Sequence, residues 1–159
     1  MAGMNSKPIV IPEFLSHLRV YFGYPVPYIQ KWFDDKPDFR IINPERVIEC
    51  VVEKLCGVCG RPLGEYCCFI GGPTSEQNHL FSDPPLHEEC AEFASSVCPF
   101  VSGRDDGYFE RAAESNAVRP ELIYILKTTT KSVTPITRSG NMLIQAGEWS
   151  GVKIVPIST

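Results

Sequence analysis

The chain has 159 residues, of which 43% are hydrophobic and 21% are charged, and its formal net charge is −4. This length fits one domain, and the composition is that of a globular protein rather than a disordered one. The negative charge argues against a general nucleic-acid-binding protein, since phosphate contacts need a basic surface. No apolar run approaches the roughly 20 residues of a membrane helix, and the N-terminus lacks signal-peptide features. We therefore expect a cytoplasmic protein.

The N-terminal part, residues 8–42, predicts an extended arm punctuated by prolines. A short helical turn is expected at 13–18, and the "KPDFRII" stretch predicts a short strand. The arm is rich in aromatic side chains, which dominate many protein-binding surfaces. These side chains either pack over the rest of the protein or form a recognition surface. The candidate partner-binding residues are Tyr24, Tyr28, Trp32 and Phe33.

A helix is predicted over 44–55, directly after the arm. Asn43 is a favourable N-cap, and Pro44 suits the first helical position. Apolar residues recur at helical spacing and form one face. The helix leads directly into Cys56.

The spacing of cysteine and histidine is the most informative pattern in the sequence. "LCGVCGRPLG" contains Cys56 and Cys59, and "DPPLHEECAEFASSVCPF" contains His87 and Cys90. Seven cysteines in a chain that we expect to be cytoplasmic indicate reduced thiols and metal binding. Three thiolates and one imidazole complete the tetrahedral shell of a single structural zinc ion.

The elements between the two ligand pairs predict a treble-clef-like zinc module over residues 43–100. The Cys-x-x-Cys turn is followed by a predicted hairpin around a Gly-Gly-Pro turn. A second helix is then expected to begin near 83–85 and to end at Pro99, with His87 and Cys90 in its first turn. Of the other cysteines, Cys50 and Cys98 are interpreted as packing residues. Cys67 and Cys68 are adjacent in a strand and should point to opposite faces.

The C-terminal part, residues 101–159, predicts a weak helix near 108–117 and then a small antiparallel sheet. The strands are expected within 121–137, 141–149 and 152–157, with a hairpin turn at "RSGN". Lys127 and Lys131 lie along the first of these segments, and Arg138 follows directly after it. If it forms a sheet edge, it either accepts a partner strand or uses its charges against aggregation. The whole chain is thus expected to be one α+β domain, residues 1–159.

Several motifs resemble a family of uncharacterised bacterial and phage-encoded zinc-binding proteins. They are "GYPVPYIQKWFDDKPDFRIINP", "LCGVCGRPLGEY" and "PPLHEECAEFASSVCPF". The resemblance covers roughly residues 23–100, and the C-terminal part is similar only in hydrophobic pattern. It implies zinc binding through Cys56, Cys59, His87 and Cys90. It also implies an intracellular setting, which is the host cytoplasm if the protein is phage-encoded or derives from a mobile element.

The absence of a recognisable catalytic motif leads to our functional hypothesis. We expect a non-enzymatic, zinc-stabilised module that binds another protein. Our hypothesis is a phage or mobile-element accessory protein that binds a host or defence protein. One alternative is an HNH-like metal-dependent nuclease or a nucleic-acid-modifying enzyme with His79 as general base. That alternative lacks the paired histidines such enzymes need, because His87 is assigned to zinc and His17 lies in the arm, which we expect to be remote. The other alternative is a structural protein that assembles as a homo-oligomer.

Overall fold

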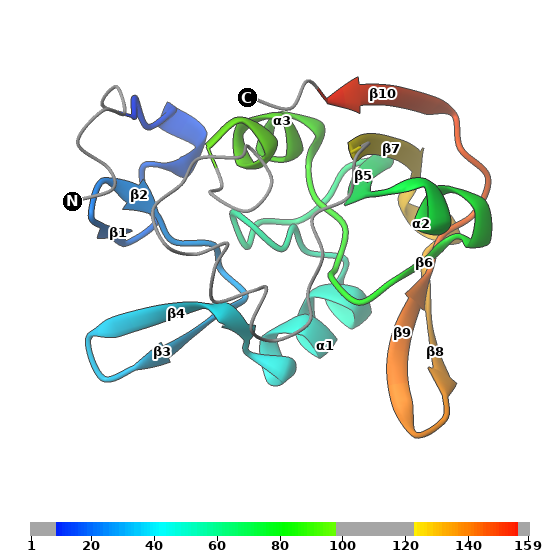
Figure 1. Ribbon diagram of the computed structural model, residues 1–159, viewed down its shortest axis with the longest axis horizontal. Helices are drawn as coiled ribbons and strands as arrows, with labels where there is room; N and C mark the ends of the chain where they lie inside the picture. Colours follow the sequence, from blue (N-terminus) through cyan, green and yellow to red (C-terminus); the bar gives the residue numbers. More distant parts are fainter. Residues whose placement is uncertain (1–8, 98–122, 156–159) are drawn as a thin grey trace.

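The computed structural model describes residues 9–97 and 123–155, which form a mixed α+β fold with small antiparallel sheets (Figure 1). The elements, in chain order, are η2 (Glu13–Leu15), β1 (Val20–Tyr21), β2 (Tyr24–Pro25), β3 (Gln30–Phe33), β4 (Lys36–Ile42), α1 (Pro44–Glu53), β5 (Tyr66–Gly71), α2 (Pro73–Asn78), β6 (Leu80–Phe81), α3 (Glu88–Val97), β7 (Ile123–Thr129), η3 (Thr130–Ser132), β8 (Thr134–Arg138), β9 (Asn141–Gln145) and β10 (Gly151–Val155). Within this part of the chain, no helix is long and apolar enough to cross a membrane.

The N-terminal part is more regular than the predicted extended arm. The short helical turn forms as η2, and the predicted strand in "KPDFRII" forms as β4. However, β1 pairs with β2 and β3 pairs with β4, so the arm folds into two antiparallel hairpins. The β1–β2 turn is tight because Phe22 and Gly23 both adopt positive φ, 49° and 82°. This left-handed turn was not foreseen, since Phe rarely adopts such a conformation.

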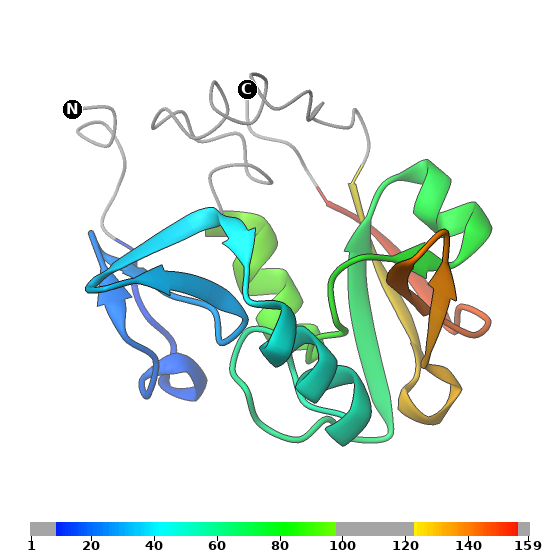
Figure 2. The ribbon, with the colours of Figure 1, turned by 90° about the horizontal axis from the view of Figure 1, so that it is seen from below.

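Helix α1 forms as predicted. The side-chain oxygen of Asn43 accepts hydrogen bonds from the backbone N–H groups of Glu45 (3.0 Å) and Arg46 (3.4 Å). The helix ends at Lys54, whose φ of 58° turns the chain towards Cys56. In Figures 1 and 2, α1 and α3 lie between the N-terminal hairpins and the sheet formed by β5, β7 and β10.

The three-stranded sheet β10-β7-β5 separates two hydrophobic clusters. Cys68 of β5 and Ile125 of β7 belong to the cluster that includes α3, whereas Cys67 and Leu126 belong to the cluster that includes α1. Adjacent residues on a strand point to opposite faces, so the prediction for Cys67 and Cys68 is confirmed. Cys50 is fully buried in the second cluster, as expected for a packing residue.

The predicted hairpin around the Gly-Gly-Pro turn is wrong. Gly72 is the N-cap of α2 and Pro73 occupies its first turn, where a missing N–H costs nothing. Strand β5 pairs with β7 instead, and β6 pairs with β9. These partners are distant in the sequence, so local turn residues could not reveal them.

The C-terminal strands form largely as predicted. Strands β8 and β9 make a hairpin whose turn residues, Ser139 and Gly140, both have positive φ. The expected polar edge strand is only partly correct. Lys127 lies in β7, which is the central strand of its sheet, whereas Arg138 lies in β8 at a sheet edge. The predicted helix at 108–117 and the residue Cys98 lie outside the described residues.

Candidate metal centre

Four predicted ligands converge in the structure. Cys56 and Cys59 come from the turn after α1, Cys90 from the first turn of α3, and His87 from the residue just before that helix. Their candidate ligand atoms all lie within 4.8 Å of one another. The three cysteines are buried and His87 is half-buried. These residues therefore lie close enough to hold one metal ion.

The Cys56–Cys59 turn is closed by backbone hydrogen bonds and depends on two glycines. Gly60 N–H donates to the carbonyl of Cys56 at 2.8 Å, and Gly60 has a φ of 75°, which favours glycine. Glycine is needed at position 57 for a steric reason, because a Cβ there would lie 2.8 Å from a side-chain carbon of Pro84. The turn is thus shaped for close contact with the chain that carries the second ligand pair.

The segment before α3 is extended, which corrects the predicted helix start at 83–85. The carbonyl of Pro85 accepts a hydrogen bond from Gly57 N–H at 3.1 Å. Leu86 exchanges two backbone hydrogen bonds with Cys68 of β5, each of 2.7 Å. Because these backbone groups are already bonded to other segments, the helix begins only at Glu88. His87 still lies beside Cys90, since Ala91 N–H donates to the carbonyl of His87.

The imidazole of His87 has one nitrogen directed at the sulfur atoms. Its Nε2–H donates to the carbonyl of Pro62 at 2.9 Å. The other nitrogen, Nδ1, lies 3.3 Å from the Cys59 sulfur and 4.0 Å from the Cys90 sulfur. A hydrogen bond from the non-ligating nitrogen fixes the tautomer of a metal-binding histidine. The structure therefore assigns Nδ1 as the ligand atom.

The sulfur of Cys56 is the natural site of negative charge in this cluster. Hydrogen bonds from the thiols of Cys59 and Cys90 hold the pKa of Cys56 well below its usual range. The backbone N–H groups of Cys59 and His87 also point at this sulfur, at 3.5 and 3.4 Å. For the same reason, the pKa values of Cys59 and Cys90 are raised. A divalent cation would reverse this second effect, because coordinating thiols lose their protons.

The donor set fits a soft or borderline divalent metal. Three sulfurs and one imidazole nitrogen are the ligands that tetrahedral zinc sites use, and oxygen-preferring ions such as calcium or magnesium have no donor here. The site is therefore compatible with one zinc ion. With four protein ligands, the shell would have no position for a reacting water molecule.

His17 was expected to be remote from the metal centre, and that expectation is wrong. Its Nε2–H donates to the carbonyl of Cys59 at 2.7 Å. The neighbouring Leu15 is fully buried in the same cluster as Cys56, Cys59 and Cys90. The N-terminal turn thus packs over the metal centre, and no local pattern in the sequence indicates a contact between residues so far apart.

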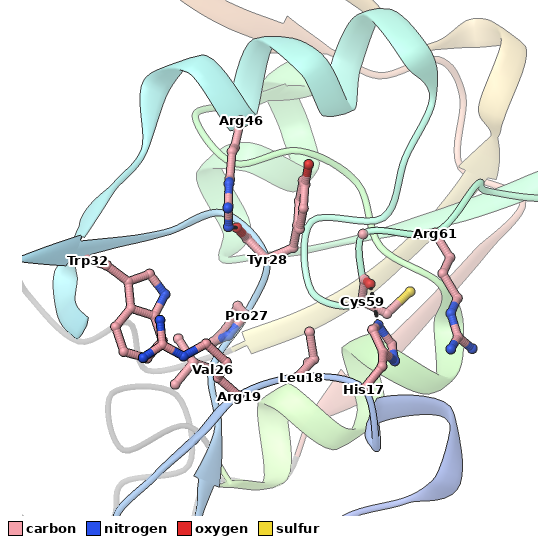
Figure 3. Close-up of a pocket in the computed structure, with 11 residues that line it drawn as sticks. His17, Leu18, Arg19, Val26, Pro27, Tyr28, Trp32, Arg46, Cys59 and Arg61 are labelled. Carbon is pink, nitrogen blue, oxygen red and sulfur yellow. Dashed lines mark hydrogen bonds between the residues drawn. The ribbon is translucent and has the colours of Figure 1, made fainter. Parts of the chain in front are cut away.

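Of the four aromatic residues predicted to bind a partner, three are half-buried and one is exposed. Tyr28 and Trp32 are half-buried and line a cavity of about 330 Å³ beside the metal centre (Figure 3). Tyr24 is half-buried in β2, and the side chain of Phe33 is 52% exposed. Three arginines also line this cavity, Arg19, Arg46 and Arg61. Sequence reasoning missed Arg19 and Arg46, because they meet the aromatic rings only through the tertiary fold.

His79, the candidate general base of the nuclease alternative, is held in place by a hydrogen bond and by a stacked aromatic ring. Its Nδ1–H donates to the carbonyl of Gly147 at 2.8 Å, and its ring stacks on Trp149 with centroids 4.6 Å apart. The Trp149 indole in turn donates to the carbonyl of Glu76. Over residues 9–97 and 123–155, the Cys56 cluster is the one group of potential metal ligands. His79 is therefore not beside a second metal site in this part of the chain.

Comparison of the chain with protein-family models, with curated proteins and with solved structures gives no match. Function must consequently be argued from the site and the surface themselves.

Proposed function

We propose that this chain is a zinc-stabilised, non-enzymatic protein-interaction module. The observation that carries this proposal is the contrast between the two ends of the N-terminal region. The chain near Leu15 is buried against the three candidate cysteine ligands, whereas the hairpin tips carry exposed apolar side chains. Buried thiolate sites stabilise folds, and exposed apolar residues grouped together mark contact surfaces.

The zinc ion would act as a structural cross-link in a treble-clef-like arrangement. The Cys56–Cys59 turn, strand β5 and helix α3 follow one another in the order of that motif. The hairpin is reduced to β5 and the single antiparallel bridge between Cys68 and Leu86, with α2 and β6 inserted between them. A fourfold N/S shell supports a structural role for the ion rather than a catalytic one.

The proposed contact surface is formed by the two N-terminal hairpins. Val20, Phe22 and Phe33 are 52%, 82% and 52% exposed. Phe22 gives the strongest support. Its positive φ costs conformational energy because the side chain is bulky, and its exposed ring leaves apolar area in contact with water. Such a combination is expected where the side chain inserts into a partner.

The resemblance to phage-encoded proteins supports a partner from the host, including a defence protein. In this proposal the module acts by occupying its partner's surface. The formal net charge of −4 favours a protein partner over nucleic acid.

Affinity capture with a matched pair of surface variants tests the proposal. The metal-loaded protein is expected to retain a stoichiometric partner from host lysate, and the Phe22→Ser/Phe33→Ser variant is expected to lose it. The control is Val152→Ser/Ile154→Ser, which removes two exposed apolar residues from β10, 52% and 62% exposed. Light scattering on the purified protein identifies self-association, the alternative use of such a surface. Equal capture by both variants, or retention of no partner by the wild type, contradicts the proposal.

A further inference from the structure

The cavity beside the metal centre is lined by apolar and basic side chains. Its apolar floor is formed by Leu18, Val26 and Pro27, and its charged lining side chains are all basic (Figure 3). The volume of about 330 Å³ is within the range of sites that bind small molecules or a single side chain. One wall is the backbone of Cys59 and Gly60, so the cavity is built directly on the proposed zinc turn.

Two arginines are positioned in this cavity by aromatic rings. The guanidinium carbon of Arg19 lies 3.7 Å from the centroid of Trp32, and that of Arg46 lies 4.5 Å from the centroid of Tyr28. Arg46 is held further by a 2.7 Å hydrogen bond from Nη1 to the carbonyl of Tyr28. Stacking of this kind orients a guanidinium while leaving its edge free to donate.

Among the residues that the structure describes, neither arginine forms an ion pair with a carboxylate. The ion pairs that the structure describes join Lys127 to Glu88 and Lys153 to Glu88 and Glu92. Glu49 accepts a hydrogen bond from the hydroxyl of Tyr28, a lining residue, but Glu49 is not itself part of the lining. Arg19 and Arg46 thus present guanidinium groups that no described carboxylate pairs with, and an anion is the ligand that complements them.

The available donors favour a carboxylate over a phosphate. Phosphate sites commonly use helix N-termini or runs of free backbone N–H groups. Here the N–H groups of Val26, Tyr28 and Gly60 are already bonded within the protein, and Pro27 has none. What remains is guanidinium edges, whose paired donors match the two oxygens of a carboxylate. The apolar floor would accept the aliphatic stem of an acidic side chain.

We propose that this cavity binds an aspartate or glutamate side chain of an acidic protein segment, with flanking apolar residues seated on Phe22 and Phe33. The inference rests on the proposed protein-interaction function and names the chemistry of the partner. Charge complementarity between the two arginines and the segment identifies the occupant, and the exposed apolar residues of the adjacent hairpins account for its flanks.

Peptide titration of the metal-loaded protein tests the inference. The probes are a short peptide that alternates glutamate with leucine and phenylalanine, its glutamine counterpart, inorganic phosphate and acetate. We expect the acidic peptide to bind. Its glutamine counterpart should bind roughly ten- to a hundredfold more weakly, since it lacks the hydrogen bond between a charged donor and a charged acceptor. The indole signal of Trp32 should shift in a proton–nitrogen correlation spectrum, whereas that of Trp149, bonded to Glu76, should not.

Arg19→Gln is the principal variant, because Arg19 contacts Trp32 without a hydrogen bond from its guanidinium and its loss should leave the fold intact. This substitution should weaken binding of the acidic peptide by a similar factor. Arg46→Lys keeps the charge but loses the paired donors and should weaken binding less. The matched control is Arg138→Gln, since Arg138 is an exposed arginine of β8 that does not line the cavity.

Three outcomes would overturn the inference. In the titrations, these are equal binding of the acidic and glutamine peptides, equal loss in Arg19→Gln and Arg138→Gln, and saturable binding of phosphate without binding of the peptide. Capture of the lysate partner by Arg19→Gln at wild-type level would reject this cavity as the contact while leaving the proposed function in place.

Discussion

The backbone N–H of His87 donates a hydrogen bond to the sulfur of Cys56, 3.4 Å away, so each ligand pair supports the other. This contact places the chain before α3 directly against the Cys56–Cys59 turn. The two halves of the metal centre are therefore held together by the backbone as well as by any bound ion. Loss of the ion should consequently disturb the region that joins α1, β5 and α3.

The first prediction concerns metal content and stability. The purified protein should contain one zinc ion per chain, and Cys56→Ser should contain little. Structural zinc contributes on the order of 10–16 kcal/mol in isolated fingers, which is comparable to the net stability of a domain. A strong chelator should therefore lower the melting temperature markedly or unfold the protein. Elemental analysis and thermal melts measure both quantities, and a melt that metal removal leaves unchanged would refute a structural role.

The second prediction concerns Gly60. Its φ is 75°, and an added Cβ would stand 2.8 Å from the Tyr28 ring. Gly140 is a matched control, because its φ is 80° but no atom lies within 4 Å of such a Cβ. Both Gly→Ala changes should cost about 1 kcal/mol from backbone strain, and Gly60→Ala should cost a further 1–3 kcal/mol from crowding. Chemical denaturation of both variants gives the difference, and equal costs would show that Tyr28 moves aside freely.

The third prediction concerns the pH dependence of stability. Burial raises the pKa of Cys50 to about 12, compared with the ordinary value of 9.0. Above about pH 9 the unfolded thiol ionises while the folded thiol stays neutral, so stability falls with rising pH until the folded pKa is reached. The slope is about 1.4 kcal/mol per pH unit for one such thiol.

Comparison with Cys50→Ala isolates this contribution, because the other thiols titrate in both proteins. The free energy of unfolding of the metal-saturated wild type should decline more steeply above pH 9 than that of the variant. Parallel declines would mean that Cys50 is accessible to solvent in the folded state.

The fourth prediction separates the structural from the catalytic interpretation of His79. His79→Asn retains a residue that tolerates the observed φ of 61° but removes the stack on Trp149. We expect a loss of about 1–2 kcal/mol in stability and no change in zinc content. Incubation with plasmid and magnesium or manganese should show no cleavage by either protein. Cleavage by the wild type that disappears in the variant would favour the nuclease alternative.

The sequence by itself determined the elements whose causes are local. The Asn43 cap and Pro44 define the start of α1, and turn residues define the β8–β9 hairpin. The spacing of Cys56, Cys59, His87 and Cys90 indicated the metal centre, since each pair is joined by one turn of chain. Alternation along β5 correctly placed Cys67 and Cys68 on opposite faces.

Only the tertiary structure decided which distant segments meet. The pairing of β5 with β7, the delayed start of α3 and the contact of His17 with Cys59 all depend on hydrogen bonds between residues far apart in the chain. The same is true of the stacking of Arg19 on Trp32, which creates the basic cavity. Such contacts arise from the shared burial of many residues, so no short pattern in the sequence specifies them.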